Sequence, residues 1–257
     1  MFSNWKQTMY DVKDGIETQH KLVGAYLIWS ALCVYWGTYN NIDIYQFYGP
    51  ELSVADLLIL QQHDYFAGIT IFPFAAFLIM KCKENSLNVQ YILRYGDRKC
   101  TLQKQIIESI WYSLILSVLL VAMQVLFAWI KTGNLINWDS FDSLYYYKIG
   151  EFTDTNVLWV IIGVMLMYFI KLLIVFVCID LLMWYPKVIF LVWVALILVV
   201  GIELFAERQV FHLLFSVKYE LWSNPFRQFA YLGFGAVYVG IQYLVGRILV
   251  KRKDIFH

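Results

Sequence analysis

The chain has 257 residues, of which 61% are hydrophobic and 15% are charged, and its formal net charge is +1. A water-soluble domain of this size needs more polar surface than such a composition supplies, so an ordinary soluble protein is excluded. The near-neutral charge gives no indication of a nucleic-acid partner, and none is expected. We expect an all-α membrane protein in which residues 1–257 form a single transmembrane domain.

Apolar segments follow one another along the chain at lengths suited to crossing a bilayer. A hydrocarbon core about 30 Å thick requires roughly 20 apolar helical residues, because backbone polar groups in lipid must be satisfied within the segment. The predicted spans are 22–39, 65–80, 106–130, 157–184, 188–204 and 229–250. They predict a bundle of six transmembrane helices.

Lysine and arginine are unevenly distributed between the segments that connect these spans, and the positive-inside rule converts this bias into an orientation. With the amino terminus in the cytoplasm, the inner segments hold Lys6, Lys13, Lys21, Lys81, Lys83, Arg94, Arg98, Lys99, Lys104, Lys187, Arg247, Lys251, Arg252 and Lys253. The outer segments hold only Lys131, Lys148, Arg208, Lys218 and Arg227. The bias predicts a multi-pass protein of the cell membrane with both termini in the cytoplasm.

The two outer loops, 40–64 and 131–155, are rich in aromatic and acidic residues. The run Tyr145, Tyr146 and Tyr147 is typical of a membrane-interface belt, where a ring is buried and its hydroxyl stays wet. Interfacial anchoring is favoured over a ligand-binding role for these residues.

The cytoplasmic segment 81–105 contains a predicted short amphipathic helix over residues 84–95, which is either a plain interfacial helix or a partner-docking element. Leu87 and Tyr91 fall on one helical face, and Gly96 is well placed to end the helix. A second short apolar stretch, within 206–228, is too brief for a span. It fits helices that dip into the outer leaflet before a break at Asn224 and Pro225, and a plain interfacial loop is the alternative.

The order of these features resembles the membrane subunits of type-2 ABC exporters. Glu84 soon after the second span, the run from Asn88 to Tyr95 and the turn 96–99 match the layout of the family's coupling-helix loop. The basic cluster 251–253 followed by Asp254 is similar to the family's carboxyl end. The resemblance implies an amphipathic amino-terminal helix, a cytoplasmic coupling helix and a short extracellular re-entrant helical segment. The first outer loop, 40–64, is longer than the family's usual connection.

The resemblance also implies a function and its partners. The chain would be the permease subunit of an exporter that moves a peptide, a lipid or a hydrophobic compound. It would pair with a second permease subunit, as a homodimer or heterodimer, and with an ABC ATPase subunit that binds ATP and Mg, because the chain has no Gly-rich lysine loop of its own. The ATPase-docking residues would be Glu84, Asn88, Tyr91, Ile92, Leu93, Arg94, Tyr95, Gly96, Asp97 and Arg98.

Two ionisable residues within the fourth span are candidates for a transport pathway, because charges at membrane depth are costly and often functional. Lys171 is expected to extend its long stem to the cytoplasmic interface, and Asp180 is expected to be an interfacial carboxylate. The histidines His20, His63, His212 and His257 all lie outside the spans, so a metal site or an intramembrane protease is disfavoured and the chain is not expected to be an enzyme. A non-transporting membrane scaffold or an immunity protein stays open as an alternative.

Overall fold

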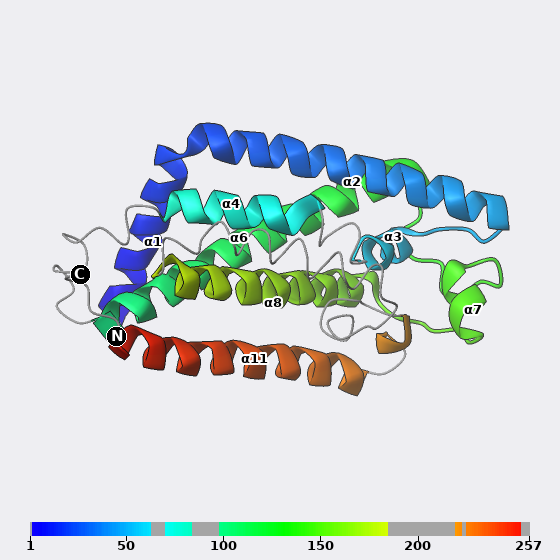
Figure 1. Ribbon diagram of the computed structural model, residues 1–257. Coiled ribbons are helices and arrows are strands. Elements are labelled where there is room, and N and C mark those ends of the chain that lie inside the picture. Colours follow the sequence, from blue (N-terminus) through cyan, green and yellow to red (C-terminus); the bar gives the residue numbers. More distant parts are fainter. Residues whose placement is uncertain (1, 63–69, 84–97, 185–218, 223–224, 253–257) are drawn as a thin grey trace, which may run out of the picture.

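The computed structural model describes residues 2–62, 70–83, 98–184, 219–222 and 225–252. Within these ranges every regular element is a helix, and the only other pairing is an isolated bridge between Glu51 and Ser143 (Figure 1). The prediction of an all-α protein is therefore confirmed for the part of the chain that the structure describes.

Four of the helices are long and apolar enough to cross a membrane. They are α2 (His20–Tyr48), α6 (Arg98–Thr132), α8 (Val157–Met183) and α11 (Pro225–Arg252). This finding indicates a membrane protein. The predicted span 188–204 lies outside the described residues.

The second predicted span, 65–80, corresponds in its described part to the shorter apolar helix α4 (Phe72–Cys82). Pro73 stands in its first turn, where a missing N–H costs nothing. The region expected to be the first outer loop is also different from the prediction, because α2 continues as a helix through Tyr48. Within the region expected to be a loop, an apolar run that includes Leu57 forms the separate short helix α3 (Val54–Leu60).

Helix α8 lies at the centre of the bundle, between α11 on one side and α4 and α2 on the other, and α6 crosses diagonally next to it (Figure 1). In its most apolar stretch 67% of the residues are buried, against 17% for α11. Among the described helices, the central one therefore contributes the largest share of the buried apolar residues, while α11 presents most of its surface to its surroundings. The large side chains that α11 exposes are mostly apolar, as expected for a helix that faces lipid.

Both ends of the described chain lie at the same end of the bundle. Helix α1 (Phe2–Thr18) lies across this end, and the last turns of α11 finish close to it (Figure 1). Trp184, at the end of α8, belongs here too, because it packs with Leu102 and Val250. The described residues on the two sides of 185–218 lie at opposite ends, since Tyr219 contacts Tyr145 of α7 at the far end.

The far end is closed by α3, by α7 (Leu144–Ile149) and by the one-turn helix η4 (Tyr219–Leu221). Ser53 caps α3 in a capping box with Asp56, and Ser143 caps α7. Gly150 ends α7 at a φ of 79°, a left-handed conformation that favours glycine.

Candidate functional site

The residues predicted to dock an ATPase lie at the edge of what the structure describes. Arg98 is the first residue of α6, and its side chain is not described. The remaining docking residues lie outside the described residues, and so does the re-entrant stretch up to residue 218. They are Glu84, Asn88, Tyr91, Ile92, Leu93, Arg94, Tyr95, Gly96 and Asp97. The docking surface therefore stays a prediction, but the residues that flank it are visible.

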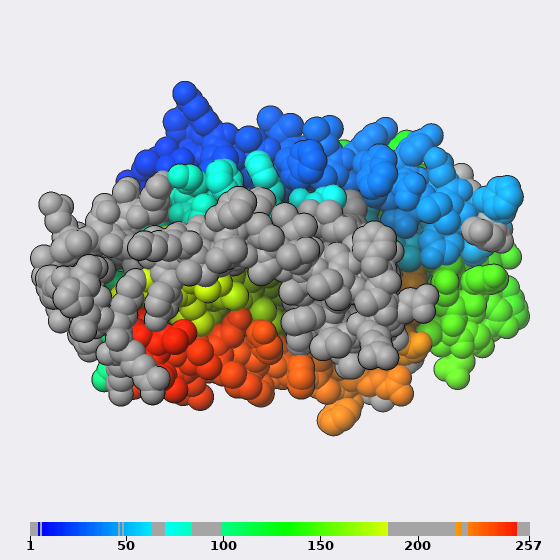
Figure 2. All heavy atoms as spheres, viewed as in Figure 1, coloured from blue at the N-terminus to red at the C-terminus, as the bar shows by residue number. Residues whose placement is uncertain are grey.

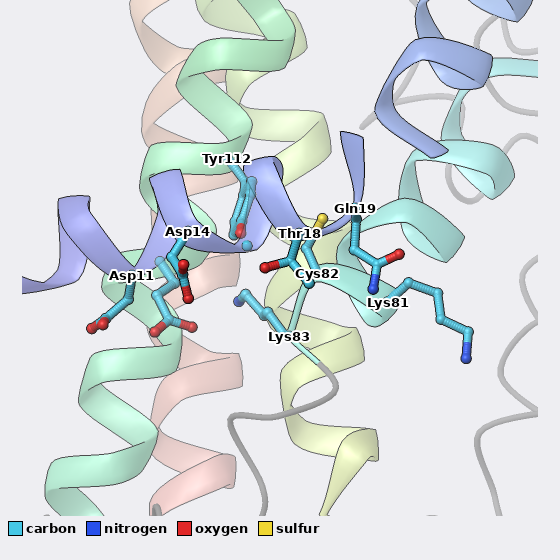
Figure 3. A pocket seen from close by; sticks show the side chains of 10 residues that line it. Asp11, Asp14, Thr18, Gln19, Lys81, Cys82, Lys83 and Tyr112 are labelled. Atoms are coloured by element: carbon cyan, nitrogen blue, oxygen red, sulfur yellow. The ribbon is translucent and has the colours of Figure 1, made fainter. Parts of the chain in front are cut away.

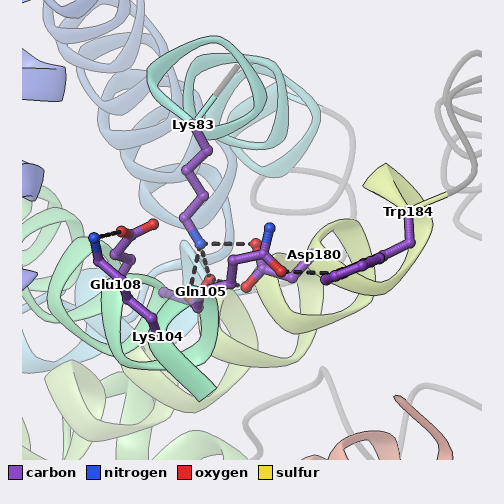
Figure 4. A network of polar contacts seen from close by, with 7 residues as sticks. Lys83, Lys104, Gln105, Glu108, Asp180 and Trp184 are labelled. Atoms are coloured by element: carbon purple, nitrogen blue, oxygen red, sulfur yellow. Dashed lines mark hydrogen bonds and ion pairs between the residues drawn. The ribbon is translucent and has the colours of Figure 1, made fainter. Parts of the chain in front are cut away.

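Lys83 ends α4 immediately before this segment, and it is held in a buried polar network (Figure 4). Its ammonium group donates to Asp180 Oδ1 at 2.7 Å, to Ser109 Oγ at 2.6 Å and to the carbonyl of Gln105 at 2.9 Å. The Ser109 hydroxyl in turn donates to Asp180 Oδ2 at 2.6 Å. The lysine and the carboxylate are 1% and 0% exposed, so this is a fully desolvated ion pair that joins α4, α6 and α8.

Gln105 of α6 also connects this network to the end of α8. While its backbone carbonyl accepts from Lys83, its side-chain Oε1 accepts from the indole N–H of Trp184 at 3.0 Å (Figure 4). Lys83 and Trp184 are the last described residues before 84–97 and 185–218, respectively. Gln105 thus bonds to the residue before segment 84–97 and to the residue before segment 185–218.

A second group of charges lies on the neighbouring face of α6 and ties α1 to the bundle. The Lys104 ammonium lies 2.5 Å from Asp11 of α1 and 3.9 Å from Glu108 of its own helix. Lys104 and Glu108 are buried, whereas Asp11 is about one-third exposed. Because α1 lies across the bundle end, this pair connects the amino-terminal helix to the same helix that holds Lys83.

A small polar pocket of about 100 Å³ lies between α1, the end of α4 and α6 (Figure 3). Its lining is formed by Asp11, Asp14, Gly15, Thr18, Gln19, Lys81, Cys82, Lys83, Glu108 and Tyr112. Its lining includes both carboxylates and lysines, and Asp11 and Asp14 lie on the opposite side from Lys81 (Figure 3). Among the described residues no group of three or more histidines, cysteines and carboxylates is arranged to hold a metal ion.

Lys171 is buried in the middle of the bundle, so the expectation that its stem extends to the interface is wrong. Its ammonium group donates to Gln62 Oε1 at 3.1 Å and lies 5.9 Å from the centre of the Tyr168 ring. Gln62 in turn donates to the carbonyl of Val164. The lysine is 1% exposed because polar groups that follow α3 reach it inside the bundle. Lys171 is therefore a buried charge within a predicted span, and its hydrogen-bond partner is Gln62.

The prediction that Asp180 is an interfacial carboxylate is also wrong, because its side chain is fully buried. Its position near the end of the span did not reveal that α4 ends opposite it. In the sequence Lys83 is one of many predicted cytoplasmic charges, and it lies 97 positions before Asp180. No local pattern in the sequence indicates such a pair.

A buried carboxylate at the far end of the bundle was also missed. Asp56 of α3 accepts from the indole N–H of Trp138 at 2.9 Å and from the backbone N–H and hydroxyl of Ser53 at 2.9 and 2.6 Å. Burial raises the pKa of the Asp56 carboxyl above its usual 3.8, although the hydrogen bonds from Ser53 and Trp138 oppose that rise. The capping pattern Ser53-x-x-Asp56 was a signal that could have placed Asp56 at a helix start.

Comparison of the chain with protein-family models, with curated proteins and with solved structures gives no match. Its function is therefore argued from its own residues.

Proposed function

We propose that this chain is the membrane-spanning permease subunit of an ABC exporter. In this proposal a separate ATPase subunit binds ATP and Mg and docks on residues 84–97, and a second permease subunit completes the complex. The transported compound would be a peptide, a lipid or a hydrophobic molecule. The proposal places the α1 end of the bundle in the cytoplasm, as the distribution of lysine and arginine predicts.

The observation that carries the proposal is the position of Lys83. A permease driven by a partner must transmit movement of its docking segment to its transmembrane helices. Lys83 directly precedes the proposed docking segment and is bonded to Gln105 and Ser109 of α6 and to Asp180 of α8. Arg98, directly after the segment, begins α6 itself. Any displacement of 84–97 would therefore act on three helices through rigid, buried contacts.

The predicted crossing at 188–204 is supported by where its neighbours lie. Trp184 and Tyr219 lie at opposite ends of the bundle, which is the arrangement that a crossing between them requires. Together with the four long helices and the predicted second span, such a crossing would give the six spans of the proposal. This count agrees with the proposed orientation, in which both termini share one side.

The proposal is tested by purifying the tagged full-length chain in a mild detergent and identifying any ATPase that copurifies. ATP turnover of the complex is then measured for the wild type and for a Tyr91→Asp, Arg94→Glu double variant. We expect the double variant to lose the ATPase or its turnover, because both changes put negative charge on the proposed docking helix.

A matched control changes the same residue types at the other end of the bundle. Tyr147 and Arg227 are both exposed there, so a Tyr147→Asp, Arg227→Glu double variant should keep both the ATPase and its turnover. Equal turnover in the docking variant and the control would reject the docking segment. A chain that performs its activity with no nucleotide-hydrolysing companion would reject the proposed function as a whole and favour a scaffold or an immunity protein.

A further inference from the structure

The segment 132–156, which contains α7 and is called here the α7 platform, is an ordered structure at the far end of the molecule. It protrudes beyond the bundle next to the end of α2 (Figure 2). Its carbonyls at Asn134 and Leu135 accept from the N–H groups of Val54 and Ala55 at the start of α3, at 2.9 and 3.1 Å. The carbonyl of Asp142 accepts from the Glu51 N–H at 2.6 Å. These bonds hold the platform rigidly on the bundle.

The platform has a small core of its own, and that core does not use all of its aromatic residues. Trp138 and Tyr145 are buried and stack with their ring centres 4.4 Å apart, and Trp138 is also bonded to Asp56. Phe141 and Phe152, in contrast, are 70% and 47% exposed. Rings of this size are the groups that dominate binding energy at protein interfaces.

The two exposed rings pack with the half-buried Tyr146 in one cluster, defined here as the aromatic cluster of Phe141, Tyr146 and Phe152. The ring centres lie 5.1 Å apart for Phe141 and Tyr146, 4.8 Å for Phe141 and Phe152, and 4.6 Å for Tyr146 and Phe152. Because the rings pack directly on each other, they leave no cage for a small cation between them. They form a raised apolar surface suited to a larger partner.

The charged residues in the segment that holds the aromatic cluster are mainly acidic. The platform carries four exposed carboxylates, at Asp139, Asp142, Glu151 and Asp154. Its basic residue, Lys148, lies over the ring of Tyr45 on α2, at 5.7 Å from the ring centre. Exposed rings with carboxylates next to them in sequence are complementary to a partner that combines apolar side chains with lysine or arginine.

We propose that the aromatic cluster of the α7 platform is a docking surface for a cationic, amphipathic polypeptide segment. Apolar side chains of the partner pack on Phe141 and Phe152, while its lysines and arginines face Asp139, Asp142, Glu151 and Asp154. Phospholipid headgroups fit this surface less well, because their phosphates are repelled by the same carboxylates. The inference does not depend on an ATPase partner or on the side of the membrane that the platform faces.

The test uses the full-length chain in nanodiscs of phosphatidylcholine, whose zwitterionic surface has little attraction for a cationic peptide. The probe is a fluorescent Leu/Lys amphipathic helix of about 18 residues, five helical turns. A Leu/Glu peptide of the same design serves as the opposite-charge probe. Binding is measured by fluorescence anisotropy, with empty nanodiscs as the baseline, at low and at high salt.

We expect a Phe141→Ala, Phe152→Ala double variant to weaken binding of the Leu/Lys peptide by about tenfold or more, as for aromatic anchors at other interfaces. Replacing the four carboxylates by their amides should weaken it similarly and remove most of the salt dependence. A Phe229→Ala, Phe234→Ala double variant removes two other exposed rings, both on α11, and should bind like the wild type. Unchanged elution and melting of each variant excludes misfolding.

Three results would overturn the proposal. Binding of the Leu/Lys peptide no stronger than to empty nanodiscs would assign it to lipid. Equal affinity of the wild type and the Phe141→Ala, Phe152→Ala variant would leave the cluster as a membrane-interface anchor. Equal binding of the Leu/Glu peptide would show that the carboxylates select nothing. None of these readouts involves ATP, so failure here is distinguishable from failure of the permease proposal.

Discussion

The ion pair between Lys83 and Asp180 provides the sharpest test of how the bundle is held together. At a separation of 2.7 Å and an effective dielectric constant of about 20, the attraction between the two charges is about 6 kcal/mol. Part of this offsets the cost of removing both groups from water. Replacing Asp180 by Asn removes one charge and leaves the Lys83 ammonium in an apolar bundle. Loss of one partner from such a buried pair costs about 3–5 kcal/mol.

The same reasoning predicts a different outcome when both charges are removed. A Lys83→Met, Asp180→Leu double variant fills similar space without a charge, and its cost should be about 1–2 kcal/mol, mainly from the bonds lost by Ser109 and the Gln105 carbonyl. Unfolding of the full chain in mixed anionic and neutral detergent micelles measures each variant. The two single variants, Lys83→Met and Asp180→Leu, should each be less stable than the double variant, because each leaves one buried charge without its partner. Additive effects, with the double variant the least stable, would refute the view that the two charges depend on each other.

Three further predictions concern separate sites. Because burial raises the pKa of Asp56 above 3.8, the folded chain binds this proton more tightly than the unfolded chain. The free energy of unfolding should therefore fall as pH rises from about 4 through the raised pKa, and Asp56→Asn should remove that decline in a pH series of unfolding curves. Gly163→Ala would place a methyl group 2.7 Å from a buried indole and should lower stability by about 1–3 kcal/mol, while Gly240→Ala, which meets no atom within 4 Å, should not; melting of the two variants decides. Cys100 is exposed and should react with a membrane-impermeant maleimide only from the cytoplasmic side, whereas the buried Cys33 should react only after unfolding; labelling of Cys100 from outside would overturn the orientation.

A short-range sequence signal predicted where the last helix begins. Pro225 begins α11, next to the break expected at 224–225. The C-terminal end of α2 and the start of α3 were not predicted, because residues 40–48 are polar and aromatic and resemble a loop. In the structure these residues are the last turns of α2, which has 29 residues. A bilayer requires only about 20. Hydropathy records where lipid begins and ends, and a helix is free to extend past that limit.

Charges within the bundle were located by the sequence but not paired by it. Lys171 and Asp180 were identified as candidates, since an ionisable residue in an apolar span is conspicuous. Their partners, Gln62 and Lys83, are 109 and 97 positions away, on segments whose depth in the bundle depends on how the helices pack. Periodicity shows which face of a helix is polar, but it contains no information about which other helix lies opposite.

The sequence by itself determined that this chain is helical and suited to a membrane, because in lipid each backbone polar group has to be satisfied within its own segment and only long apolar helices do this. Only the tertiary structure decided that α8 is central, that Lys83 meets Asp180, and that Trp138 meets Asp56 while Phe141 and Phe152 stay exposed. These contacts join residues far apart in the chain. They exist because helix packing brings together groups that must share hydrogen bonds once water is excluded.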